Sequence, residues 1–167
     1  MTLDDILTEH KNNILNFVEL CKGKTIAFDF DGTLTRFQYD TSRMLPCKDS
    51  DIEEYTKSGK NIYKNIQIFK TMKFIISQLN MADIFIVTST VPSLREIKNK
   101  IIFENFGIRA DRILHTYNSS EKIDVLRNIY TKNKKDILFV EDNFKILLAA
   151  EETLSFVRGY LISSLWA

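Results

Sequence analysis

The chain has 167 residues, of which 44% are hydrophobic and 27% are charged, and its formal net charge is +1. These values are typical of one globular domain, and they predict no general attraction to nucleic acid or to anionic membranes. Cys21 and Cys47 are the only cysteines, too few for a disulfide framework, so a reduced, cytoplasmic protein is expected. No apolar run approaches the roughly 20 residues that cross a bilayer, and the first ten residues lack a signal-peptide pattern.

Hydrophobic spacing predicts helices that alternate with short buried strands. Helices are expected at residues 3–21, 62–79, 93–106, 120–130 and 143–152. Strands are expected at residues 25–30, 83–88, 112–116, 136–140 and 156–162. Ser93, and then Ser119 or Ser120, should cap two of the helices, and Gly107 should end one. The alternation indicates a single doubly wound α/β domain over residues 1–167, with about five parallel strands and helices on both faces of the sheet.

One segment, residues 36–60, breaks this pattern directly after the first strand. It is polar and charged, and it contains Pro46 and Gly59. Connections of this length are uncommon unless they have a function. A small, irregular cap or lid over a binding site is therefore expected here.

Polar side chains follow three of the predicted strands, at the end of the sheet where ligands bind in open parallel folds. The segments are Asp29-Phe30-Asp31-Gly32-Thr33, Thr88-Ser89-Thr90 and Glu141-Asp142-Asn143. Lys122 lies near the start of the helix before the third segment. Carboxylates, a hydroxyl group and an amine are thus expected to converge on one crevice.

This set of residues is suited to phosphoryl chemistry. Asp29 and Asp31 are two residues apart on extended chain, which places both side chains on one side, and Gly32 allows a sharp turn. Clustered carboxylates with open positions suit Mg²⁺, which would offset the repulsion between a carboxylate nucleophile and a phosphate dianion. One Asp could attack phosphorus while the second transfers protons, with Thr88 and Lys122 on the phosphoryl oxygens.

The same segments resemble, in order, the four signature motifs of the haloacid dehalogenase superfamily. The Asp-x-Asp-Gly-Thr motif is similar to residues 29–33, the strand-ending Thr to Thr88, the helix-opening Lys to Lys122, and the acidic pair to Glu141-Asp142. The fourth motif is similar to that of the β-phosphoglucomutase-like branch. The resemblance covers about residues 24–162 and implies a Rossmann-like fold and a phosphatase acting through an aspartyl-phosphate.

The resemblance also implies roles for individual residues. Asp29 would be the nucleophile and Asp31 the acid/base, with Thr88 and Lys122 completing the catalytic set. Mg²⁺ would be held by Asp29, the backbone carbonyl of Asp31, and Asp142, with Glu141 assisting. Substrate contacts are expected from Gly32, Thr33 and Ser89.

Members of that branch carry a helical cap domain of about seventy residues, and here only the short segment 36–60 stands in its place. This difference argues against a sugar phosphomutase, which needs a closed site that excludes water. An open crevice suits a phosphorylated small molecule, a larger phosphorylated substrate, or a site that a neighbouring subunit of a homo-oligomer closes.

Three other functions stay open at this stage. They are phosphoryl transfer to a second substrate, a catalytically quiet protein that binds a partner, and a nucleic-acid-processing phosphatase. Individual residues have plainer interpretations as well. Asp142 could cap the following helix, Thr88 could cap after its strand, and Lys122 could be a solvated surface lysine. His115 and Arg95 border the expected crevice without an assigned role.

Overall fold

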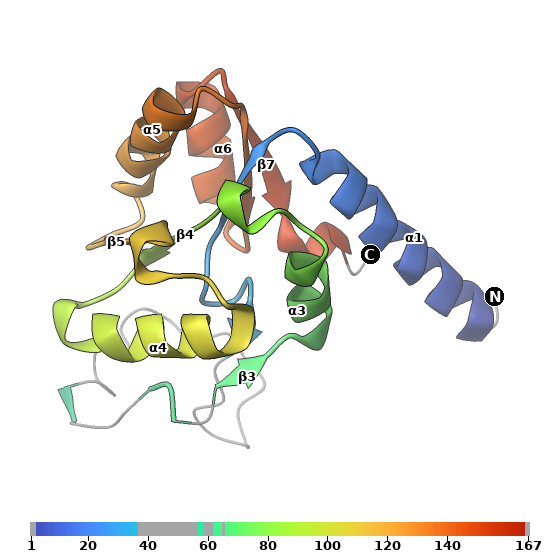
Figure 1. Cartoon of the computed structure of the whole chain (residues 1–167), viewed down its shortest axis with the longest axis horizontal. Coiled ribbons are helices and arrows are strands. Elements are labelled where there is room, and N and C mark those ends of the chain that lie inside the picture. The colour runs from blue at the N-terminus through green and yellow to red at the C-terminus, as the bar shows by residue number, and fades with distance from the viewer. Residues whose placement is uncertain (1–2, 37–56, 59–61, 65, 166–167) are drawn as a thin grey trace.

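Five parallel strands form one sheet in the order β5-β4-β1-β6-β7 (Figure 1). The structure is a computed structural model that describes residues 3–36, 57–58, 62–64 and 66–165. The strands are β1 (Thr25–Phe28), β4 (Ile84–Ser89), β5 (Ile113–Thr116), β6 (Ile137–Glu141) and β7 (Val157–Leu161). After β1 the chain forms β4 and β5 on one side of this strand, and then β6 and β7 on its other side. This arrangement confirms the predicted doubly wound α/β fold, with β1 at the centre of the sheet.

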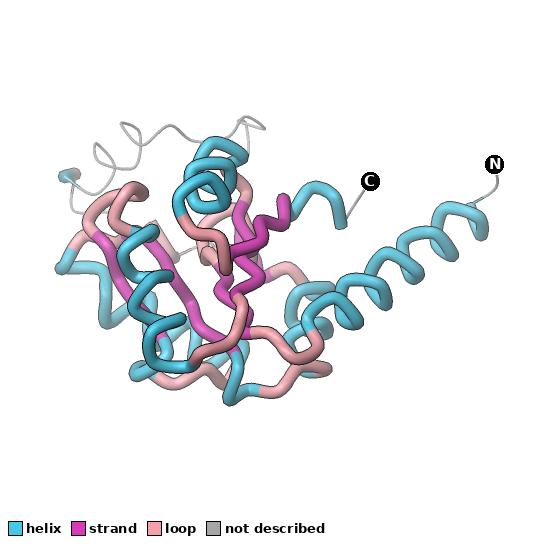
Figure 2. Tube along the Cα trace, turned by 90° about the horizontal axis from the view of Figure 1, so that it is seen from above, coloured by secondary structure: helices cyan, strands magenta, loops and turns pink. Residues whose placement is uncertain are grey.

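Helices cover both faces of this sheet. Two hydrophobic cores result, one of which includes residues from α1 (Leu3–Cys21), α3 (Lys70–Ser77) and α4 (Arg95–Phe106). The other core includes α5 (Lys122–Asn133) and α6 (Phe144–Thr153). In both Figure 1 and Figure 2 the N-terminal part of α1 projects away from the rest of the domain, while its C-terminal end packs against it.

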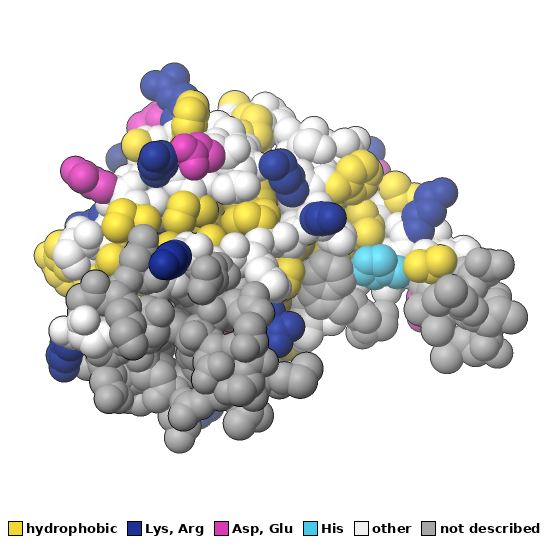
Figure 3. Space-filling view, turned by 90° about the horizontal axis from the view of Figure 1, so that it is seen from below, with side chains coloured by type: hydrophobic (Ala, Val, Ile, Leu, Met, Phe, Trp, Pro, Cys, Tyr) yellow, Lys and Arg dark blue, Asp and Glu magenta, His cyan; other side chains and the backbone are white. Residues whose placement is uncertain are grey.

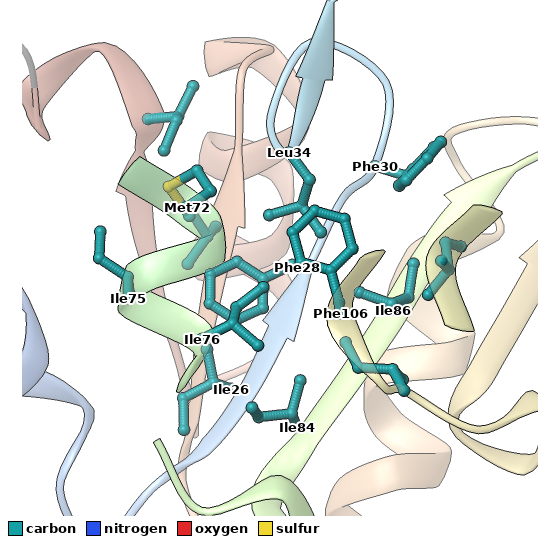
Figure 4. Packing of buried hydrophobic residues seen from close by; sticks show 14 of the residues in the cluster. Ile26, Phe28, Phe30, Leu34, Met72, Ile75, Ile76, Ile84, Ile86 and Phe106 are labelled. Carbon is teal, nitrogen blue, oxygen red and sulfur yellow. The ribbon is translucent and has the colours of Figure 1, made fainter. Parts of the chain in front are cut away.

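Side chains of β1 alternate between the two cores. Ile26 and Phe28 face the core that contains Met72 and Ile76 of α3 (Figure 4), whereas Ala27 belongs to the opposite core. Every residue of β1 and β6 is buried. This explains their nearly continuous apolar sequence, because a strand covered on both faces has no solvent side.

The predicted helix at residues 62–79 is wrong in its first part. Residues 62–64 form a turn, and β3 (Gln67–Ile68) pairs with β2 (Thr35–Arg36) in a small antiparallel ladder. The helix α3 begins only at Lys70. The apolar residues Ile62 and Tyr63 are buried in the core as part of this turn, so their spacing reflects packing rather than helical period.

The two predicted serine caps are also wrong. Pro92–Leu94 forms a 3-10 turn before α4, and the residue preceding α4 makes no side-chain cap hydrogen bond. Glu121, the residue before α5, makes no side-chain cap hydrogen bond either. Ser120 instead donates to Asn118 Oδ1, which also accepts from the Glu121 backbone N–H. Gly107 does end α4, in a left-handed conformation with φ of 70°, as expected. Further 3-10 turns lie at Met81–Asp83, Ala110–Arg112 and Ile162–Leu165.

Most of the expected cap segment, residues 37–56 and 59–60, lies outside the described residues. Among the helices that the structure describes, none combines the length and apolar character needed to cross a bilayer.

Candidate functional site

A buried lysine joins two carboxylates at the C-terminal edge of the sheet. Asp29 directly follows β1, Glu141 ends β6, and Lys122 begins α5. The Lys122 Nζ atom donates to Asp29 Oδ1 and to Glu141 Oε2, both at 2.7 Å. All three residues are at most 4% exposed. Lys122 is therefore not a solvated surface lysine. Contacts among β1, β6 and α5 fix the position of the Asp29 carboxylate.

Three carboxylates at this edge could hold a metal ion. Asp29, Glu141 and Asp142 each offer an oxygen, and these oxygens lie within 4.8 Å of one another. Gly32 lies against this group, because a Cβ atom added there would be 2.2 Å from Asp142 Oδ2. Its φ of 84° also favours glycine. Gly32, which was expected from the sequence to contact substrate, thus leaves room for the Asp142 carboxylate.

Asp142 does not cap the helix that follows it. Asn143 is the N-cap of α6, and its side chain accepts from the Lys145 backbone N–H at 3.1 Å. The Asp142 side chain is consequently not needed for this cap, and the alternative interpretation of Asp142 as a helix cap is wrong. The Asn143 N–H donates to Glu141 Oε1 at 3.3 Å, which helps to hold the second carboxylate of the pair.

A second buried lysine lies on the other side of β1. Lys98 of α4 is fully buried, and its Nζ atom donates to Asp31 Oδ2 at 2.6 Å and to Thr88 Oγ1 at 3.0 Å. Its third contact is the Ser89 carbonyl at 3.1 Å. The carboxylates of Asp29 and Asp31 are therefore bound by lysines from helices on opposite faces of the sheet. The carboxylate of Asp31 also lies outside the group of three that could hold a metal.

The remaining predicted contact residues lie near this edge of the sheet but differ in their partners. Thr33 is fully buried, and its Oγ1 atom has no hydrogen-bond partner among the described residues. Ser89 is half-buried, and its hydroxyl lies 3.0 Å from Thr116 Oγ1. Thr88 accepts from Lys98, so this hydroxyl is tied to the second lysine rather than to a helix cap.

The charges of the site do not balance when every group is ionised. Four carboxylates, on Asp29, Asp31, Glu141 and Asp142, accompany two ammonium groups, on Lys98 and Lys122. Two negative charges remain, which is the charge that one divalent cation would neutralise. Without a cation, carboxylates in such a cluster take up protons more readily.

Burial and the neighbouring charges together shift the pKa values at this site. Burial, together with the charge of Asp29, raises the pKa of Glu141 from 4.5 to about 9, although Lys122 opposes the change. Burial alone would lower the pKa of Lys122, but the charges of Asp29 and Glu141 outweigh it, so this pKa is raised. Burial also raises the pKa of Asp31, and Lys98 opposes that shift.

His115 and Arg95 are held in the adjoining β5 region by local partners. The His115 Nε2 atom is 2.8 Å from Asn99 Oδ1, and burial with the charges of Lys98 and Arg95 lowers the pKa of His115 to about 4. Arg95 donates to the Thr90 carbonyl and lies over the ring of Tyr117. These contacts account for the placement of both side chains, while the His115 Nδ1 atom is buried without a hydrogen-bond partner among the described residues.

Lys98 is the site residue that the sequence interpretation missed. A signal was present, because the buried residues Leu94, Lys98, Ile102 and Phe106 recur every four positions along the chain. A lysine within an otherwise apolar helical stripe indicates a buried cation that needs a carboxylate partner.

The face shown in Figure 3 carries hydrophobic and basic side chains side by side. Basic groups are spread singly over its described part rather than gathered into one patch. This part of the surface offers no concentrated basic footprint of the kind that favours nucleic acid.

No protein-family model matches this chain, and the curated proteins that were searched include no match. The fold and the geometry of the site therefore carry the functional argument.

Proposed function

We propose that this protein is a Mg²⁺-dependent phosphomonoester hydrolase of the haloacid dehalogenase type, with Asp29 as covalent nucleophile. The observation that carries the proposal is the position of Asp29. This carboxylate follows the central strand, is 4% exposed, accepts a hydrogen bond from Lys122 and lies beside the oxygens of Glu141 and Asp142. Ligands of doubly wound folds bind at this edge of the sheet.

The donor set of the site fits Mg²⁺. Asp29, Asp142 and the backbone carbonyl of Asp31 would hold the ion, with Glu141 in support, and all of these ligands are oxygen atoms. When bound, the ion supplies positive charge that reduces repulsion between the nucleophile and a phosphate dianion. The unbalanced negative charge of the site and the space left by Gly32 beside Asp142 support this assignment.

The reaction would proceed in two displacements at phosphorus, the first with Asp29 as nucleophile and the second with water. An Asp29 oxygen attacks phosphorus, the bond from phosphorus to the ester oxygen breaks, and that oxygen takes the proton of the Asp31 carboxyl group. Water then attacks the aspartyl-phosphate, gives its proton to Asp31, and releases the Asp29 carboxylate and inorganic phosphate. After both displacements, Asp29 is again a free carboxylate and Asp31 again carries its proton.

Two donors are available for the charge that develops on the phosphoryl oxygens. Lys122 has three N–H donors and uses two of them on Asp29 and Glu141, which leaves one for a ligand. The hydroxyl of Thr88 accepts from Lys98, so its own hydrogen is available to donate. Donors of this kind stabilise the transition state because they are already in position.

The test is phosphate release from a panel of phosphorylated metabolites, aryl phosphates and short 3′-phosphorylated oligonucleotides. Parallel reactions would contain Mg²⁺ or EDTA. We expect release that needs Mg²⁺ and that Asp29→Asn eliminates. Transfer of phosphate to a second metabolite without release would instead support a phosphotransferase. Absence of both reactions across the panel would count against the proposal.

A further inference from the structure

The ammonium group of Lys98 is fixed by three acceptors at once. A lysine has three N–H donors, and here they go to Asp31 Oδ2, Thr88 Oγ1 and the Ser89 carbonyl at 2.6, 3.0 and 3.1 Å. No donor is left for a fourth partner. Lys98 is also fully buried, so water does not compete for these contacts.

Rigid elements hold this ammonium group in place. The side chain comes from the first turn of α4, and two of the three acceptors belong to β4, next to the central strand. The rings of Phe30 and Tyr63 each lie with their centroids 5.5 Å from Nζ. Aromatic rings at this distance attract a cation and shield it from solvent. The position of Asp31 Oδ2 is thus set by the packing of α4 against β4.

The two oxygens of Asp31 are consequently different. Oδ2 accepts the short, charge-assisted hydrogen bond from Lys98, whereas Oδ1 is buried and has no hydrogen-bond partner among the described residues. An oxygen that faces an ammonium group cannot at the same time carry a proton pointed at it. The ammonium charge disfavours protonation of the oxygen that it contacts, so the geometry favours Oδ1 as the oxygen that carries a proton on this carboxyl group.

We propose that Lys98 is a positioning residue that fixes Asp31 Oδ2 and thereby leaves Oδ1 as the oxygen that exchanges protons with the leaving group and with water. This inference rests on the proposed function. In the first displacement the Oδ1 proton passes to the departing ester oxygen, and in the second Oδ1 receives the proton of the attacking water. Lys98 itself gives up no proton and touches no reacting atom.

The test separates proton delivery from a merely structural role by the choice of leaving group. The 4-nitrophenolate ion leaves without a proton, whereas an alkoxide needs one. For Lys98→Met we expect kcat/KM to fall about 100-fold with the best alkyl phosphate of the panel and less than about 5-fold with 4-nitrophenyl phosphate. Lys100→Met is the matched control on the same helix, where the side chain is 74% exposed, and both rates should be unchanged.

A double variant keeps the test decisive if Lys98→Met does not fold. Removal of one member of a buried pair leaves an uncompensated charge, whereas Lys98→Met with Asp31→Asn removes both charges together. Because Lys98 acts through Asp31, the double variant should match Asp31→Asn within about twofold in kcat/KM for the alkyl phosphate.

The outcomes distinguish this inference from the proposed function. Equal losses with both substrates, no loss, or a double variant far below Asp31→Asn would overturn the role of Lys98 while the parent remains a phosphatase. A parent chain that releases no phosphate from any substrate would overturn both.

Discussion

The two buried lysines of the site face different electrostatic situations. Lys122 on α5 donates hydrogen bonds to two carboxylates, those of Asp29 and Glu141, and the Asp142 carboxylate lies close by. Lys98 on α4 serves one carboxylate, Asp31, and two neutral acceptors on β4. Negative charge is therefore in excess on the α5 side and balanced on the α4 side.

One edge of the sheet can therefore support two tasks. Excess negative charge attracts a cation, and a cation bound there would offset the repulsion between a carboxylate nucleophile and a phosphate dianion, so the α5 side suits metal binding and attack. A balanced pair holds its carboxylate in one geometry without needing a further ion, so the α4 side suits directed proton transfer. Four measurements test this division.

The largest effect should come from Asp29→Asn. An amide is a poor nucleophile, so we expect phosphate release to fall on the order of 10⁴-fold while the fold is retained. Circular dichroism and thermal unfolding would show the fold, and phosphate release the activity. The exposed Asp111→Asn is the matched control and should keep its rate. Activity preserved in Asp29→Asn would place the nucleophile elsewhere.

Stability should then separate the two lysines. Without metal, Lys122→Met should lower the free energy of unfolding by about 3–5 kcal/mol, and by more than Lys98→Met, because two buried carboxylates lose a partner rather than one. Urea unfolding would measure this. Lys132→Met, on the exposed face of α5, should change the free energy by less than about 0.5 kcal/mol. A larger loss in Lys98→Met would contradict the charge assignment.

Magnesium should stabilise through the α5 side alone. At a hundredfold excess over its dissociation constant, Mg²⁺ should raise the free energy of unfolding by about 2.7 kcal/mol. Asp142→Ala should lose most of this gain, whereas Lys98→Met should keep it because Lys98 contacts none of the three clustered carboxylates. Thermal unfolding and titration calorimetry are independent of activity. A full response to Mg²⁺ in Asp142→Ala would refute the metal assignment.

The last prediction concerns pH and Glu141. Since its folded-state pKa is raised from 4.5 to about 9, the folded protein binds this proton more tightly than the unfolded chain does. This contribution to stability is complete below pH 4.5 and is lost as pH rises towards about 9. Metal-free unfolding should thus show a decline across this window that Glu141→Gln reduces. Identical slopes in the two proteins would mean that Glu141 does not keep its proton.

Local patterns in the sequence were enough for much of the fold. The apolar runs before Asp29 and Glu141 predicted central strands, because residues covered on both faces must all be hydrophobic. The helix that ends at Gly107 was equally clear. The turn and short ladder at residues 62–68 could not be predicted from local patterns, because Gln67 and Ile68 become a strand only by pairing with residues about thirty positions earlier.

The alternation of strands and helices and the carboxylates after the strands were readable from the sequence alone, because hydrophobic period and strand polarity are local properties. Which ammonium group meets which carboxylate depended on the tertiary structure. Lys98 and Asp31 are 67 positions apart, and Lys122 and Asp29 are 93 apart. Pairs at such separations are set by how each helix is rotated and docked on the sheet, which depends on the packing of the whole core.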